Sequence, residues 1–212
     1  MKKKYETVQP SYLKNSRHFL KDILMVVQKT DGENWAFFGE ENATDFTLNF
    51  IKHGDLSRLI YVDEVPAAYV ECFLIKSSNL TLLQDDYYHT LGLSSADFKE
   101  SYSSNQADYS NYSLYVNVVA VVREYQNSIR MLRELISAIQ DILFNNFVKR
   151  PEFISAVAVS KEGEKMCESL GFQKISESQR RYRDKINNRK FYCGKTLEVM
   201  QRLERFEKNC GL

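Results

Sequence analysis

Cysteine and histidine, the side chains that most often bind metals or act as nucleophiles, are few and widely separated in this chain. Their positions are Cys72, Cys167, Cys193, Cys210, His18, His53 and His89. No cysteines are paired at the short spacing of a zinc site, and no histidine lies beside one of them. We therefore expect no metal centre and no disulfide framework.

The densest group of charged side chains is the basic run from Arg180 to Lys190. We expect it to form an exposed hairpin between the last two strands, where solvation alone accounts for its charge. A nucleic-acid or acidic partner is the alternative interpretation. The chain as a whole has 29 basic and 28 acidic residues, so no general field attracts a polyanion, and we expect no nucleic-acid partner.

Length and composition are those of one globular domain over residues 1–212, with 43% apolar and 13% aromatic residues available for a core. The basic N-terminus, Met1 to Lys4, is followed by polar residues and not by the apolar run of a secretory signal. No stretch reaches the roughly 18 apolar residues of a membrane-spanning helix. A cytoplasmic protein with no membrane partner is expected.

Hydrophobic periodicity and turn residues predict alternating helices and strands. The predicted strands are 5–8, 59–62, 67–75, 114–122, 153–159, one beginning at Phe172, and 190–194. The predicted helices are 13–27, about 44–53, 128–149, 161–170 and 197–206. Asp63 to Pro66 is the predicted turn of a hairpin, Ser160 a helix cap, and Gly171 a helix end.

Two further features define the predicted architecture. The polar stretch 76–111 is too long for a simple connection, so we expect a partly helical insertion or a substrate-facing flap there. The strand–helix–strand order from Leu114 to Val159 predicts a parallel strand pair with a right-handed crossover inside a mixed sheet. The fold class is α/β, with the sheet flanked by helices.

Three sequence features resemble the GNAT superfamily of N-acetyltransferases, and the likeness covers most of the chain from Leu59 onward. They are the hairpin from Tyr61 to Tyr69, the strand end Val119-Ala120-Val121-Val122-Arg123-Glu124-Tyr125-Gln126 before a long helix, and the segment from Ser160 that ends in Leu170-Gly171-Phe172. The resemblance implies a mixed, mostly antiparallel twisted sheet with a central parallel strand pair, flanked by helices.

The resemblance also implies where acetyl-coenzyme A, or another acyl-coenzyme A, would bind as cosubstrate. Backbone amides of Gln126, Asn127, Ser128, Ile129, Arg130 and Met131 would take the pyrophosphate at the start of the helix, where unpaired amides and the helix dipole favour an anion. Val119 and Val121 would pair with the pantetheine arm. Arg123, Arg130 and Arg133 would add charged contacts, or they are only the solvated face of a helix.

The loop departs from the family pattern, which has small residues where this chain has Ile129 and Met131. Small residues let the backbone approach a phosphate closely. Either both side chains turn into the core and leave the amides of Gln126 to Arg130 open, or they occlude the pocket. We favour the open pocket.

Three residues are candidates for the transfer chemistry. Cys167 stands where many family members have a tyrosine that protonates the departing thiolate; the alternative is a small packed hydrophobe. Glu71 is the candidate base, and a surface glutamate on an alternating strand is the alternative. Asn117 could hydrogen-bond substrate or coenzyme, or satisfy the backbone of a buried strand.

The predicted function is acyl-coenzyme-A-dependent transfer, most simply of an acetyl group, to a small-molecule or peptide amine. The tyrosines of the insertion, including Tyr102 and Tyr109, would form the acceptor side or simply pack over a core edge. The alternative function is a catalytically silent GNAT-like module that binds a ligand or a protein. A homodimer is left open.

Overall fold

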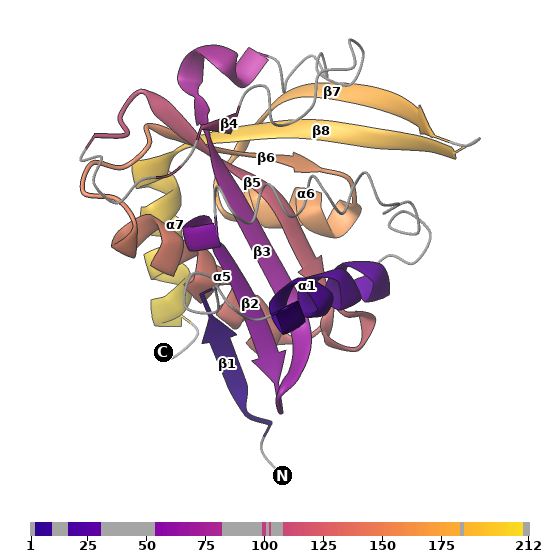
Figure 1. Ribbon diagram of the computed structural model, residues 1–212. Helices are drawn as coiled ribbons and strands as arrows, with labels where there is room; N and C mark the ends of the chain where they lie inside the picture. Colours follow the sequence, from indigo (N-terminus) through magenta and orange to yellow (C-terminus); the bar gives the residue numbers. More distant parts are fainter. Residues whose placement is uncertain are drawn as a thin grey trace. The chain divides into compact units, whose positions relative to one another are not determined.

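The computed structural model describes residues 3–9, 17–30, 54–81, 99–100, 102, 108–182 and 185–209, and Figure 1 shows their helices and strands. The chain divides into two compact units. The first consists of Met1–Cys72 and Val118–Asn146, and the second of Phe73–Asn117 and Phe147–Leu212. Strands β3 and β5 each continue from one unit into the other. The expectation of one domain over 1–212 stays a prediction.

In the first unit the strands follow the order β1-β2-β3-β5. Their bounds are Tyr5–Val8 for β1, Ser57–Val62 for β2, Val65–Lys76 for β3 and Tyr112–Val121 for β5. Strand β2 is antiparallel to both β1 and β3. Asp63 and Glu64 have φ values of 49° and 67°, which makes a two-residue turn that matches the hairpin twist. The hairpin is confirmed, but Val65 and Pro66 belong to β3 and not to the turn.

Helix α1, Arg17–Thr30, supplies one layer of the core of the first unit. Phe19, Ile23, Val26 and Val27 recur at helical spacing and pack on side chains of β2, β3 and β5, namely Leu59, Tyr69, Val118 and Ala120. The helix predicted over 13–27 is therefore present and ends three residues later. Residues 10–16 and the helix predicted near 44–53 lie outside the described residues, and a short 3-10 turn, η2, follows at Gly54–Leu56.

Helix α5, Ile129–Asn145, is the long amphipathic helix that the sequence predicts over 128–149. Ser128 caps it, since its side chain accepts the backbone N–H of Met131 at 3.2 Å. Eight of its side chains are buried, and they recur at the spacing of one helical face. The helix ends before Asn146, four residues earlier than predicted, where asparagine side chains bond to neighbouring groups of β2 and α5.

The second unit contains the order β3-β5-β6-β8-β7, and β4, Lys99–Glu100, pairs with β3. The other strands are β6 Phe153–Ala158, β7 Gln173–Tyr182 and β8 Lys185–Lys195. Strands β5 and β6 are parallel, from the pair Ser113–Phe153 to the pair Val116–Ala156, and the pairs β6–β8 and β7–β8 are antiparallel. The predicted central parallel pair in a mostly antiparallel sheet is confirmed.

Two helices complete the second unit: α6 Lys161–Ser169, whose cap Ser160 accepts the N–H of Gly163, and α7 Thr196–Asn209. The expected strand 190–194 is only part of β8, which pairs with β7 as far as Tyr182 and Lys185. The basic run 180–190 thus belongs mainly to the paired strands of one long hairpin (Figure 1).

The described part of the insertion 76–111 is held by aromatic packing. A 3-10 turn, η3 Ser77–Asn79, follows β3, and residues 80–81 are helical. Near the other end, the ring of Tyr109 lies 5.9 Å from that of Tyr102 and 5.4 Å from those of Tyr112 and Phe147. Tyr109 is almost fully buried, which favours packing over a substrate-facing role for this residue.

Replacing Gly171 by alanine is expected to destabilise the protein by about 1–2 kcal/mol. Gly171 has φ +83°, a conformation that L side chains rarely adopt, and an added Cβ would lie 2.4 Å from Nε of Arg202. Urea unfolding of G171A and of a matched G163A variant measures the effect, because the Cβ of G163A would meet only ordinary contacts. Equal midpoints for the two variants would contradict the expectation.

Candidate functional site

The last part of β5, from Val118 to Val121, has one edge paired and one edge open within the first unit. The backbone N–H of Val122 donates to the carbonyl of Ala67 on β3 at 2.9 Å. Because backbone groups alternate along a strand, the N–H groups of Val119 and Val121 point away from β3. In the part of this unit that the structure describes, no strand pairs with that edge, since the pairing of β5 with β6 stops at Val116.

A tight turn leads from this edge to helix α5. It contains the 3-10 segment η5, Arg123–Tyr125, and hydrogen bonds hold it at each step. The N–H of Gln126 donates to Arg123 O at 3.3 Å, and the N–H of Ser128 donates to Tyr125 O at 3.0 Å. Two of the six amides predicted to bind the pyrophosphate are therefore already used, and a third, the N–H of Met131, donates to Ser128 Oγ at 3.2 Å.

The other three amides of the loop have no acceptor among the residues that the structure describes. They belong to Asn127, Ile129 and Arg130, at the start of α5. The first N–H groups of a helix have no intrahelical partner, and the helix dipole adds a partial positive charge there. Among the described residues of the first unit, this group of amides is well suited to bind an anion.

The two bulky residues of the loop behave differently. Met131 is buried, with 1% of its surface exposed, and belongs to the core face of α5. Ile129 is 67% exposed. Neither alternative from the sequence holds in full, because only one of the two side chains turns into the core while the other lies on the surface beside the open amides.

Gln126 ties the turn to its neighbours through its side chain. Its Nε2 donates to the carbonyl of Val121 at 3.0 Å and lies 3.4 Å from the carbonyl of Thr30, the last residue of α1. The carbonyl of Val121 is thereby occupied, whereas the N–H of Val119 stays available. The side chain of Gln126 therefore orders the loop, while the backbone N–H of Gln126 donates within the turn.

Glu71 is buried, with 3% of its surface exposed, so the alternative interpretation of a surface glutamate is wrong. Every residue of β3 from Pro66 to Ile75 is buried, so this strand is covered on both faces and does not alternate. The hydroxyl of Tyr69 donates to Glu71 Oε2 at 3.1 Å. Burial and the charge of Glu71 raise the pKa of Tyr69 well above its usual range, so this hydroxyl keeps its proton.

Two sequence candidates belong to the second unit. Asn117 lies on the exposed side of β5, so it is not the buried strand residue of the alternative interpretation. Cys167 on α6 is buried, and burial, with a smaller contribution from the charge of Glu168, raises its pKa to about 12. The remaining candidates, Glu71, Val119, Val121 and 126–131, all lie in the first unit.

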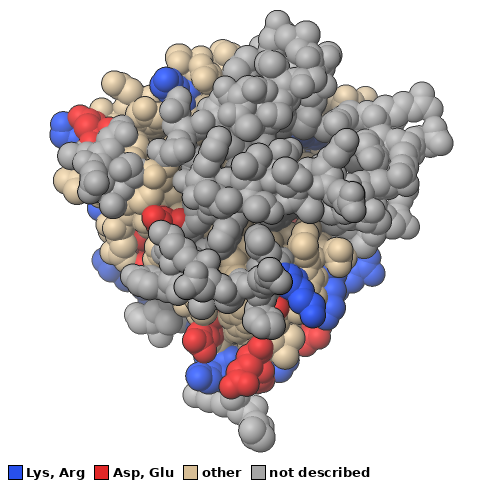
Figure 2. Space-filling view, viewed as in Figure 1, with Lys and Arg blue, Asp and Glu red and all other residues tan. Residues whose placement is uncertain are grey.

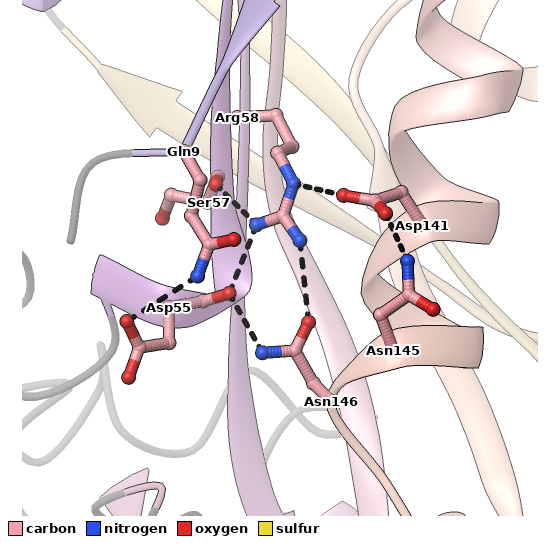
Figure 3. A network of polar contacts seen from close by, with 7 residues as sticks. All are labelled: Gln9, Asp55, Ser57, Arg58, Asp141, Asn145 and Asn146. Carbon is pink, nitrogen blue, oxygen red and sulfur yellow. Dashed lines mark hydrogen bonds and ion pairs between the residues drawn. The ribbon is translucent and has the colours of Figure 1, made fainter. Parts of the chain in front are cut away.

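A buried arginine that sequence analysis did not single out supports α5 from its other end (Figure 3). Arg58 on β2 is 1% exposed, and its Nε donates to Asp141 Oδ2 at 2.6 Å. Its Nη atoms donate to the carbonyls of Asp55 and Ser57 and to Oδ1 of Asn146.

Asn146 and Asn145 complete this network. Asn146 Nδ2 donates to Asp55 O at 3.1 Å, and Asn145 donates to the carboxylate of Asp141. The network joins the start of β2 to the last turn of α5, so the helix whose first amides are open is held at its opposite end. The only sequence signal was a basic residue at the head of the apolar run Leu59 to Val62.

The described residues contain no cluster of His, Cys, Asp and Glu that could hold a metal ion. None of the described helices is long and apolar enough to cross a membrane. In the face drawn in Figure 2, acidic and basic side chains of the described residues lie beside one another, as the balanced composition predicts.

Comparison with known proteins identifies the fold. No family model and no curated protein sequence matches this chain. Among solved structures, it is similar to the NatC complex bound to Gag peptide and CoA (10% identity, 92% of this chain and 99% of that chain, TM-score 0.55). It is also similar to the loading GNATL domain of CurA from Lyngbya majuscula (12%, 89% and 97%, 0.59).

A third similar structure is Naa50 from Arabidopsis thaliana in complex with the bisubstrate analogue CoA-Ac-MVNAL (12% identity, 92% of this chain and 99% of that chain, TM-score 0.51). Sequence identities this low bear on the fold alone. Together the similarities show that this chain has a divergent GNAT fold, as the sequence resemblance implied.

Proposed function

We propose that this chain is an acyl-coenzyme-A-dependent N-acyltransferase, with acetyl-coenzyme A as the simplest donor and a small-molecule or peptide amine as acceptor. One observation carries the proposal: the first unit places three open amides at the start of α5 directly after an open strand edge. A diphosphate fits the amides, and an extended arm with amide groups fits the edge. The fold supports this assignment.

In this proposal the N–H groups of Asn127, Ile129 and Arg130 bind the diphosphate, while the turn that Gln126 and Ser128 hold keeps them in place. The N–H of Val119 points out of the open edge, where it can pair with the arm of the coenzyme or donate to the thioester oxygen. A backbone donor that is already held in position stabilises negative charge on that oxygen at little reorganisation cost.

The transfer itself needs a base for the amine and a proton for the thiolate. The amine nitrogen bonds to the thioester carbon, the carbon–sulfur bond breaks, the amine proton goes to a base, and the departing thiolate takes a proton from water. Glu71 is the proposed base, a buried side chain whose Oε2 accepts a hydrogen bond from the hydroxyl of Tyr69. The peptide in the NatC complex and the peptide analogue bound to Naa50 support an amine acceptor.

Isothermal titration calorimetry of the full chain with acetyl-coenzyme A tests the proposal. Binding at micromolar to submillimolar ligand is expected, followed by release of free thiol when amine acceptors are added. Absence of binding up to millimolar ligand would contradict the proposed acyltransferase function. Binding without turnover of any amine would favour the alternative function, a catalytically silent GNAT-like module. This alternative is motivated by Ile129, Met131 and Cys167, which depart from the family pattern.

Substitution of Cys167 and Glu71 is expected to separate their roles. A thiol with a pKa of about 12 is a poorer acid than an ordinary thiol, so C167A should change kcat by less than about threefold. E71Q removes the proposed base and should lower kcat by about a hundredfold. Steady-state thiol release, with acetyl-coenzyme A affinity as the control, measures both. A large loss in C167A alone would make Cys167 the proton donor.

A further inference from the structure

Two aromatic residues of the first unit hold cations beside the start of α5. The guanidinium carbon of Arg130 lies 4.3 Å from the ring centroid of Tyr5 on β1. Lys3 Nζ lies 4.6 Å from the ring centroid of Tyr125 and 3.4 Å from its hydroxyl oxygen. Contacts of a cation with an aromatic face are favourable, so strand β1 is attached to both the turn and the helix that carry the open amides.

The guanidinium of Arg130 keeps its donors available while the Tyr5 ring holds it. Its Nε is 4.0 Å from Glu134 Oε1, which is an ion pair without a hydrogen bond. No hydrogen bond from Arg130 to another described residue is present, and 47% of its side chain is exposed. A ring below the guanidinium face leaves the N–H groups at its edge free, and this edge matches the oxygens of a phosphate.

Each of the two cations at this position has one carboxylate nearby: Glu124 lies 3.8 Å from Lys3, and Glu134 lies 4.0 Å from Arg130. Both distances exceed that of a hydrogen-bonded pair, so the two carboxylates do not occupy the donors of the two cations. The open amides at the start of α5 add to the positive side of this balance.

We infer that Tyr5 is a positioning residue that holds Arg130 as the binding group for a phosphate monoester, separate from the diphosphate that the amides of α5 bind. In coenzyme A this group is the 3′-phosphate. The inference rests on the proposed function, since it assigns a second phosphate of the same ligand. It makes the N-terminal strand part of the coenzyme site and makes the site selective for nucleotides that carry the extra phosphate.

Calorimetry with coenzyme A and with dephospho-coenzyme A, which lacks only the 3′-phosphate, tests the inference. Wild-type protein should bind coenzyme A about tenfold more tightly, as charge-assisted hydrogen bonds allow. In Y5L this ratio should fall about two- to fivefold, the range of one exposed cation–π contact, while Y5F should keep it. In R130Q the ratio should approach one.

Two controls separate positioning from general effects. Lys4 directly precedes β1, its side chain is exposed, and among the described residues that side chain forms an ion pair only with Glu6, so K4Q removes one positive charge and should leave the ratio unchanged. Thermal unfolding of Y5L and Y5F shows whether both are folded.

The outcomes distinguish the two proposals. Equal binding of both nucleotides by wild-type protein would overturn this inference alone, as would an unchanged ratio in folded Y5L. Absence of binding of either nucleotide would overturn the proposed function and this inference with it.

Discussion

Replacing Asp141 by asparagine is expected to lower the free energy of unfolding by about 2–3 kcal/mol, which is less than the ~3–5 kcal/mol of a fully buried ion pair because Asp141 itself is half exposed. The loss of stability arises because the substitution leaves the buried charge of Arg58 without its carboxylate partner. Arg58 is 1% exposed and keeps its charge, because a guanidinium does not lose its proton at neutral pH. The side chain of Asp141 is 42% exposed, so water reaches one partner but not the other. Urea unfolding at neutral pH measures the change.

A matched control lies on the same helix. Glu134 and Arg130 form a more exposed pair at 4.0 Å, and E134Q should change stability by less than about 0.5 kcal/mol. Replacing both partners of the buried pair, in R58M/D141L, should recover most of the stability, because apolar side chains need no compensation for a buried charge. If D141N cost no more than E134Q, Arg58 would not be an essential support of α5.

Replacing Ile129 by glutamate is expected to weaken coenzyme A binding about a thousandfold. Ile129 is exposed at the first position of α5, next to the amides proposed to bind the diphosphate. Two like charges about 4 Å apart near a protein surface repel by about 4 kcal/mol, which corresponds to this factor. Titration calorimetry of I129E with acetyl-coenzyme A measures it.

The same substitution should not harm the fold. A negative side chain in the first turn of a helix interacts favourably with the dipole, so I129E should be as stable as wild type or more stable by about 0.3–1 kcal/mol. I129Q has a similar shape without the charge and should bind nearly as well as wild type. Unchanged affinity in I129E would show that the anion binds elsewhere.

Local patterns predicted much of the fold. The turn at Asp63 and Glu64, the cap Ser160 and the helix end at Gly171 are all present, because each depends on the backbone preferences of neighbouring residues. The amphipathic periodicity of α5 and the apolar run of β5 are equally local. The boundaries were less accurate, as at Val65, since pairing with a neighbouring strand decides where a strand begins.

The side-chain directions in the loop from Gln126 to Met131 could not be predicted from local sequence patterns. Sequence spacing located the start of α5 but treated Ile129 and Met131 alike. Two residues apart on a helix, they are rotated by about 200° and point to nearly opposite sides, and only the packed face decides which one is buried. Glu71 is a similar case, because its burial depends on β3 being covered on both faces.

By itself, the sequence predicted most of the described helices and strands in their order, the parallel pair and the start of α5, since these follow from periodicity, caps and turns. Only the tertiary structure decided that Arg58 pairs with Asp141 and that Tyr5 holds Arg130, because 83 and 125 residues separate these partners along the chain. It also decided that Cys167 has a pKa of about 12, since desolvation depends on the side chains packed around the thiol.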